Sequence, residues 1–250
     1  MIACAALALT PGLVRADDAG PVSPFTLSGS ASVLSQYRFR GLSRSDGQPA
    51  VQGDLTVSHG TGFYGGVTLS SEQPGAAVDF GHGEVDLYAG KTLALGSSGL
   101  MLDLGLRGYF YADCAAADLV ELSGALDRQI GPIDLRAGVA WAPPQAHLGR
   151  DAVNGALRDN SYVFAESRAD IPGTPLHLHA HVGHTAGGLD YTGAYWDYRL
   201  GLGASHKAFG IDLSLVGTNV SHAAALATPD PLATWRAARS AGVISLTYQF

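Results

Sequence analysis

The sequence predicts an all-β protein that closes into a transmembrane antiparallel up-and-down β-barrel of about 12 strands. Three observations predict this fold. Apolar and polar residues alternate with a period of two along most of the chain. The chain has no run of 18 apolar residues that could form a spanning helix, although its mean hydropathy is +0.13 and only 15% of its residues are charged. Short and long connections alternate between the predicted strands.

The stretch 30–71 contains one complete period of the molecule. From Phe25 onward, odd positions are apolar or small and even positions are mainly polar, which predicts a first strand over 25–40. A turn-rich segment and two further alternating strands follow. The same pattern predicts twelve strands, with approximate cores at 25–40, 48–58, 62–71, 83–94, 99–112, 118–128, 131–141, 160–170, 175–186, 194–206, 210–222 and 241–250.

The connections between these strands are sorted by length. Tight ones follow the even-numbered strands, at 59–62, 96–99, 129–132, 172–175 and 207–210. Long ones follow odd-numbered strands, including 41–48, 72–83, 143–160 and 223–240. This sorting is typical of periplasmic turns and extracellular loops, and it places both chain ends on the periplasmic side. We expect a short helix near 233–239 in the last loop.

Large aromatic residues on the apolar register gather near the strand ends, as in the two interfacial girdles of membrane barrels. The predicted members are Phe39, Phe110, Trp141 and Trp196 at the outer rim, and Phe25, Phe63, Tyr248 and Phe250 at the inner rim. The last strand alternates up to the terminal Phe250, which resembles the C-terminal signal read by the barrel-assembly machinery. Outer-membrane lipid and this machinery are therefore the expected partners.

The N-terminus predicts export. Residues 1–16 have the pattern of a secretory signal peptide, 17–24 that of a periplasmic leader, and 25–250 that of the barrel, so we expect the mature protein in the cell outer membrane. Removal of the signal peptide leaves Cys114 as the single cysteine, which argues against a disulfide framework. The formal net charge of -7 argues against a nucleic acid partner.

A family resemblance is carried by YRFRGLSRSDGQPAVQG at 37–53, GFYGG at 62–66 and EVDLYAG at 84–90. These motifs resemble the TorF-type porin family of Gram-negative bacteria, and the resemblance implies an outer-membrane barrel. Read as a turn, the first motif uses Gly41 and Gly47 for unusual backbone angles and Asp46 to bond its own backbone. A second interpretation places Arg38 and Arg40 at the outer mouth as a selectivity feature.

Charged residues on the polar register are expected to point into the barrel lumen. They are Arg38, Arg40, Asp54, Glu84, Asp86, Asp103, Arg107, Glu121, Asp127, Asp134, Arg136, Glu166, Arg168, Asp170, Asp197, Arg199 and Asp212, to which His177, His179 and His181 are added. Acids outnumber bases. This pattern favours a wet lumen that passes small hydrophilic solutes or ions with a weak cation preference. The alternative is a set of mutually paired charges that plugs a narrow barrel.

His177, His179 and His181 form a column on the polar face of one predicted strand. Simple hairpin register across the 172–175 turn places Asp170 beside His177, Arg168 beside His179 and Glu166 beside His181. We interpret the column as a titratable ladder rather than a metal site, because no further set of ligands is evident. No metal and no other cofactor are expected.

Two other functional classes remain open. A plugged barrel can act as a receptor or adhesin through its extracellular loops. A barrel lipid hydrolase would need a serine, a histidine and a third member facing lipid, and His184, His206 and His222 fall on or near the apolar register. No G-x-S-x-G motif accompanies them, so we expect no catalysis.

Overall fold

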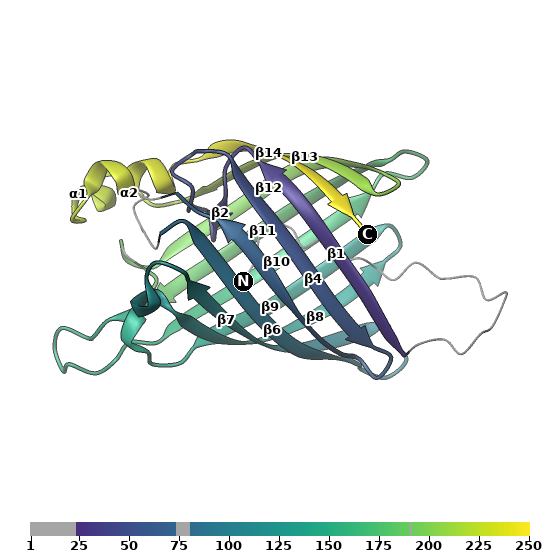
Figure 1. Cartoon of the computed structure of the whole chain (residues 1–250), viewed down its shortest axis with the longest axis horizontal. Coiled ribbons are helices and arrows are strands. Elements are labelled where there is room, and N and C mark those ends of the chain that lie inside the picture. The colour runs from purple at the N-terminus through teal and green to yellow at the C-terminus, as the bar shows by residue number, and fades with distance from the viewer. Residues whose placement is uncertain (1–23, 74–80, 191) are drawn as a thin grey trace.

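The computed structural model describes residues 24–73, 81–190 and 192–250, in which the chain closes into a barrel of twelve antiparallel strands (Figure 1). The predicted fold class is confirmed. The predicted signal peptide and the leader up to residue 23 lie outside the described residues. The barrel strands are β1 (Phe25–Leu34), β4 (Ala50–His59), β5 (Phe63–Ser71), β6 (Gly83–Ala94), β7 (Leu100–Tyr111), β8 (Leu119–Ile130), β9 (Ile133–Ala142), β10 (Asn160–Asp170), β11 (Leu176–Gly187), β12 (Tyr195–His206), β13 (Phe209–Thr218) and β14 (Ala241–Gln249).

The sheet closes where β1 pairs with β14. This ladder runs from Ser30 opposite Gln249 to Leu34 opposite Ser245. Gly29 and Phe250 extend it, because the N–H of each donates to the carbonyl of the other at 3.0 Å. Each barrel strand therefore has two neighbours. Closure pairs the backbone groups that an open sheet edge would expose to lipid.

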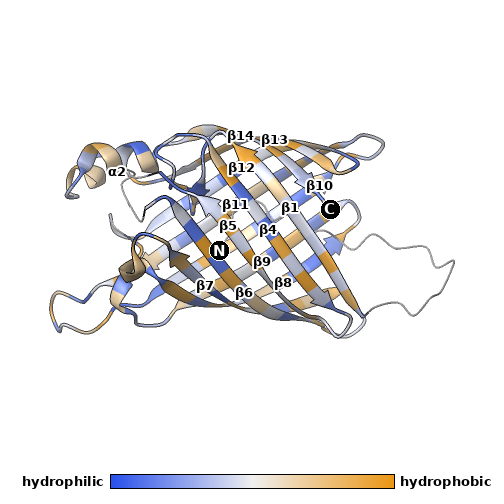
Figure 2. Cartoon of the chain, in the orientation of Figure 1, coloured by the Kyte–Doolittle hydropathy of each residue, from blue (hydrophilic) through white to orange (hydrophobic). Residues whose placement is uncertain are grey.

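Hydrophobic and hydrophilic residues alternate along the barrel strands (Figure 2), and the exposed residues are the apolar ones. On β13, Phe209, Ile211, Leu213 and Leu215 are 49–58% exposed, whereas Ser214 between them is buried. The same alternation recurs around the barrel. A continuous belt of exposed large apolar side chains is the surface that a membrane barrel presents to lipid. Most of the predicted girdle shares this exposure, namely Phe25, Phe63, Phe110, Trp141, Trp196, Tyr248 and Phe250.

The connections differ in length between the two ends of the barrel (Figure 1). Tight turns lie at the end where β1 begins and β14 ends, which we call the tight-turn end. The opposite loop end carries the longer connections, with the short helices η1 (Ala115–Ala117), η2 (Ala146–Leu148), α1 (His222–Leu226) and α2 (Pro231–Ala238). The predicted sorting of the connections is confirmed.

Helix α2 confirms the helix predicted near 233–239. It begins where the Asp230 side chain accepts a hydrogen bond from the N–H of Ala233 at 3.0 Å, with Pro231 as its first residue. The strand predicted over 210–222 is wrong at its end, because β13 stops at Thr218 and His222 begins α1. In the described ranges, no helix is both long and apolar enough to cross a membrane.

The first predicted strand is too long. β1 ends at Leu34, which pairs directly with Ala50 of β4, so residues 35–49 are an excursion from this hairpin. We call 35–49 the inward segment. It contains the short paired strands β2 (Arg38–Phe39) and β3 (Leu42–Ser43). Phe39, predicted at the lipid-facing outer rim, is instead 7% exposed, and its ring centroid lies 5.7 Å from that of Tyr109.

Candidate functional site in the barrel lumen

The inward segment is held in shape by its own serines. The Ser45 hydroxyl accepts from the N–H of Tyr37 at 2.9 Å and donates to the Gln48 carbonyl at 2.7 Å. The Ser43 hydroxyl accepts from the N–H of Gly47 at 3.0 Å. These bonds replace the backbone bond predicted for Asp46, whose carboxylate instead accepts from Arg236 of α2 at 3.2 Å.

Gly41 brings the inward segment against the barrel wall. Its φ of +78° confirms the predicted unusual backbone angle, as does the φ of +75° at Gly47. A β-carbon added at Gly41 would lie 2.6 Å from the carbonyl oxygen of Gly217 and 2.8 Å from the β-carbon of Asp197. No other residue type fits this contact, so glycine sets how closely the segment docks.

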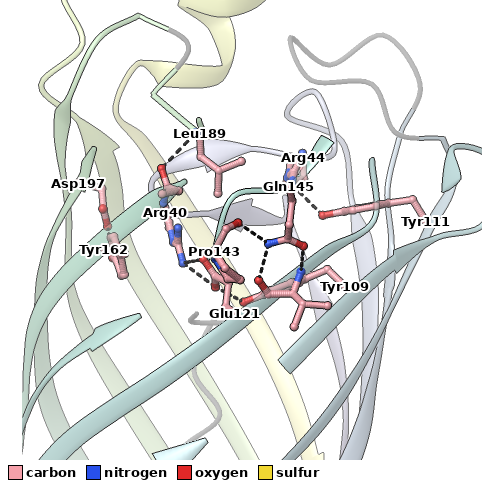
Figure 3. Close-up of polar contacts among 12 residues, drawn as sticks. Arg40, Arg44, Tyr109, Tyr111, Glu121, Pro143, Gln145, Tyr162, Leu189 and Asp197 are labelled. Atoms are coloured by element: carbon pink, nitrogen blue, oxygen red, sulfur yellow. Dashed lines mark hydrogen bonds and ion pairs between the residues drawn. The ribbon is translucent and has the colours of Figure 1, made fainter. Parts of the chain in front are cut away.

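Arg40 forms the central contact between the inward segment and the wall (Figure 3). Its Nη2 atom donates to both carboxylate oxygens of Glu121 on β8, at 2.7 and 2.8 Å. The guanidinium carbon lies 4.1 Å from the ring centroid of Tyr162, and the Tyr109 hydroxyl donates to the same carboxylate at 3.0 Å. Both side chains of the ion pair are 1% exposed, so a charged pair is sequestered from water in the lumen.

The other two arginines of the segment are also buried. Arg38 donates to the Gly41 carbonyl at 2.7 Å and to the Arg239 carbonyl at 2.9 Å, which ties the segment to the last loop. Arg44 donates to the Tyr111 hydroxyl at 3.0 Å and lies 3.7 Å from the carboxylate of Glu72. Arg38 and Arg40, predicted as strand residues at the outer mouth, therefore belong to a segment that fills the loop end of the lumen.

Two acidic residues of β6 lie beneath this segment. Glu84 accepts from the Tyr37 hydroxyl at 2.9 Å, and Asp86 accepts from Arg107 of β7 at 2.8 Å. Glu84 and Asp86 are 2% and 4% exposed. The lumen is thus densely filled at the loop end.

The lumen is more open toward the tight-turn end. There Arg136 of β9 bridges Asp103 at 2.6 Å and Asp127 at 2.7 Å, and the side chains of this trio are 15–31% exposed. On the opposite arc, Asp54 of β4 accepts from the hydroxyls of Thr68 and Tyr88 at 2.9 and 2.8 Å. Apart from His177 at the start of β11, burial of the charged lumen residues therefore decreases along the barrel axis from the loop end to the tight-turn end.

The histidine column has the predicted register. Asp170, Arg168 and Glu166 of β10 lie opposite His177, His179 and His181 of β11. The side-chain bonds follow this register only in the pair of His181 with Glu166. His181 contacts Glu166 at 2.9 Å and Asp197 at 3.0 Å, and His179 contacts Asp212 of β13 at 2.5 Å.

The remaining predicted residues lie on the same inward-facing positions. Asp170 accepts from Arg168 at 3.0 Å rather than bonding His177, which is 3% exposed. Arg199 of β12 donates to Asp212 at 2.7 Å. Asp134 of β9 is half-buried and lies opposite Arg168 in the ladder. None of the described residues forms a group of three His, Cys, Asp or Glu side chains placed to hold a metal ion.

Sequence reasoning missed the aromatic part of the site. Tyr109, Tyr111 and Tyr162 are at most 5% exposed. Tyr111 contacts Arg44 and Tyr162 contacts Arg40, whereas Tyr109 is linked to Arg40 through Glu121. The sequence does indicate that Tyr109 and Tyr111 face the lumen, because they alternate with the same period as the charged Arg107 and so lie on the same face of β7.

A loop histidine borders the inward segment. His147 of η2 lies outside the spanning strands and is half-buried. Burial lowers the pKa of His147 below its ordinary value, and the positive charge of Arg44 lowers it further. The neutral imidazole is therefore the form that suits the folded loop end.

The sequence matches a known bacterial protein family. Residues 18–240 match the model of a bacterial protein family of unknown function, Gcw_chp. The chain belongs to this family. The Gcw_chp model does not carry the TorF-type name, so that finer resemblance stays a prediction. No curated protein matches the sequence.

Solved structures resemble the Gcw_chp chain in fold. The COG4313 outer membrane channel from Pseudomonas putida F1 aligns with a TM-score of 0.50 and 13% identity, over 93% of this chain and 99% of that chain. A structure from work on in-meso crystallization of membrane proteins aligns with a TM-score of 0.51 and 10% identity, over 89% and 83%. At these identities the likeness supports the membrane-barrel fold and nothing finer.

Proposed function

We propose that the protein is an outer-membrane channel for passive diffusion of small hydrophilic solutes and ions, without a cofactor or catalysis, and that the inward segment closes it in this conformation. The observation that carries the proposal is a polar, charged lumen filled at one end by a segment that the barrel wall does not need. Because Leu34 and Ala50 pair directly, β1 and β4 form a complete hairpin without residues 35–49. A removable filling in a polar barrel suits a channel that opens and closes.

The charges of the wall support a weak cation preference. Carboxylates outnumber arginines on the inward-facing strand positions. The acids are Asp54, Glu84, Asp86, Asp103, Glu121, Asp127, Asp134, Glu166, Asp170, Asp197 and Asp212, and the arginines are Arg107, Arg136, Arg168 and Arg199. Displacing the inward segment would withdraw Arg38, Arg40 and Arg44 and leave the acidic excess facing the solute path. Local negative potential raises the concentration of cations in a narrow path.

The test is a variant in which 35–49 is replaced by Asn-Gly, a two-residue turn that suits the Leu34–Ala50 hairpin. Proteoliposomes carrying this variant should swell in an isosmotic small sugar several times faster than those carrying the wild type. The matched control replaces 151–156 by Asn-Gly between Arg150 and Leu157, which already form an antiparallel bridge in an exposed loop. The control should swell at the wild-type rate.

One observation favours a second candidate, a closed barrel that acts as a receptor through its loops. A cavity of about 280 Å³ lies at the loop end between the helices and the inward segment, lined mainly by apolar side chains that include Leu42, Tyr195, Val220 and Ala238. If the replacement variant folds but does not swell faster than the wild type, the channel proposal fails and the receptor is favoured.

A further inference from the structure

The wall residues around Arg40 form a cradle on their own. Glu121, Tyr109 and Tyr162 lie on β8, β7 and β10, so the strand pairing of the barrel wall fixes their backbones independently of the inward segment. At the level of Glu121 and Tyr162, β9 lies between β8 and β10 and presents the small side chains of Ala140 and Ala142 on its inward face. The space that these alanines leave lets a planar cation lie between the carboxylate and the ring.

The chemistry of the cradle suits a guanidinium. A carboxylate supplies the countercharge, and the face of an aromatic ring at 4.1 Å supplies a cation–π contact. The Tyr109 hydroxyl, which donates to Glu121 at 3.0 Å, orients the carboxylate. A flat guanidinium uses a carboxylate and a ring face together, whereas a compact ammonium is more strongly hydrated and does not stack.

Two nitrogen atoms of the Arg40 guanidinium make no hydrogen bond in this cradle. Its Nε and Nη1 atoms are buried and have no hydrogen-bond partner, although the residue is 3% exposed. The Oδ2 atom of Asp197 is also buried without a partner, while its Oδ1 accepts from the Tyr162 hydroxyl at 3.1 Å. Buried donors and acceptors left unpaired are costly. A free guanidinium solute can rotate to bond these groups, whereas the Arg40 guanidinium is held by the backbone of the inward segment.

We propose that Glu121, Tyr109 and Tyr162 form a binding site for solutes that bear a guanidinium group, and that Arg40 occupies this site as an internal competitor. A guanidinium solute that displaces Arg40 releases the main anchor of the inward segment. The inference names a solute class for the proposed channel and in that sense rests on the proposed function. It explains why a cationic segment is seated in an acidic barrel.

The test uses Arg40→Ala, which empties the cradle, with methylguanidinium chloride as the probe. At a concentration tenfold above its Kd, methylguanidinium should raise the Tm of the detergent-solubilised variant by about 3 °C over sodium chloride of equal concentration. Methylammonium should give no rise beyond the salt. In wild type the rise should be smaller, because Arg40 competes. In the double variant Arg40→Ala/Glu121→Gln it should vanish.

The proposal is overturned if methylguanidinium gives no rise in Arg40→Ala, if methylammonium stabilises equally, or if the double variant responds as the single one does. Should Arg40→Ala fail to fold, folding yield from urea into detergent is measured with the same additives. Recovery by methylguanidinium in the single but not the double variant supports the site, and no recovery overturns it. Binding is read without a membrane, so its failure is distinguishable from failure of the channel itself.

Discussion

The inward segment docks so closely at Gly41 that the wall leaves no room for a β-carbon there. Gly41→Ala should destabilise the protein, because a left-handed φ costs a residue with a β-carbon about 1 kcal/mol and overlap with Gly217 and Asp197 adds about 1–3 kcal/mol. Gly47→Ala is the matched control, since Gly47 has nearly the same φ but open space around its added β-carbon. Urea unfolding in micelles compares the two. Equal losses would show that Gly41 is not a close docking point.

His147 gives a pH dependence at the loop end. Its folded pKa is lowered, so the unfolded chain takes up the proton first as pH falls below about 6.5. The stabilisation from neutral His147 is fully present above that pH and is lost as pH falls through the folded pKa. Between about pH 8 and pH 5 the Tm of wild type should therefore fall further than that of His147→Gln. Parallel Tm profiles for the two proteins would contradict this.

Individual site residues were predictable only where pairing is local. The register of His177, His179 and His181 followed from the tight turn before them, because a short hairpin fixes which residues face each other. The Arg40–Glu121 pair joins residues 81 positions apart. No periodicity links such residues, so the sequence could place each charge on a polar face but could not name its partner.

At the scale of elements, the alternation of apolar and polar residues did not distinguish the inward segment from a strand of the barrel wall. Tyr37 and Phe39 alternate with Arg38 and Arg40 just as in a spanning strand, yet these residues leave the wall after Leu34. A hydrophobic pattern with a period of two predicts a strand with one apolar and one polar face, but it does not predict what each face contacts. Here the apolar face packs inside the lumen, against Tyr109 and its neighbours, instead of against lipid.

The closing ladder between β1 and β14 is the shorter of the two ladders that β1 forms. It runs over five residue pairs before Gly29 and Phe250 extend it, against ten pairs between β1 and β4. Deleting Phe250 removes two backbone bonds of this closing ladder together with the proposed signal for the barrel-assembly machinery. Heat-modifiable, folded protein in the outer membrane should fall severalfold. Phe250→Leu, which keeps the backbone pairing, should fold better than the deletion; an unchanged yield on deletion would contradict the expectation.

At the scale of the whole molecule, the barrel was predictable because one physical demand acts on every strand. Lipid requires apolar outward side chains and a fully paired backbone, so the same alternation repeats in each crossing and the tight turns fall at one end. The filling of the lumen obeys no such repeated demand. It depends on one loop that folds inward, and its contacts are specific to that loop.

The most direct test of the central claim is a planar-bilayer recording of wild type beside the variant in which Asn-Gly replaces 35–49. We predict that the variant gives steady single-channel steps with a reversal potential of cation-selective sign in a salt gradient, while wild type is mostly closed. The acidic wall, freed of Arg38, Arg40 and Arg44, is the physical reason for that sign. A folded variant that conducts no better than wild type would contradict the account.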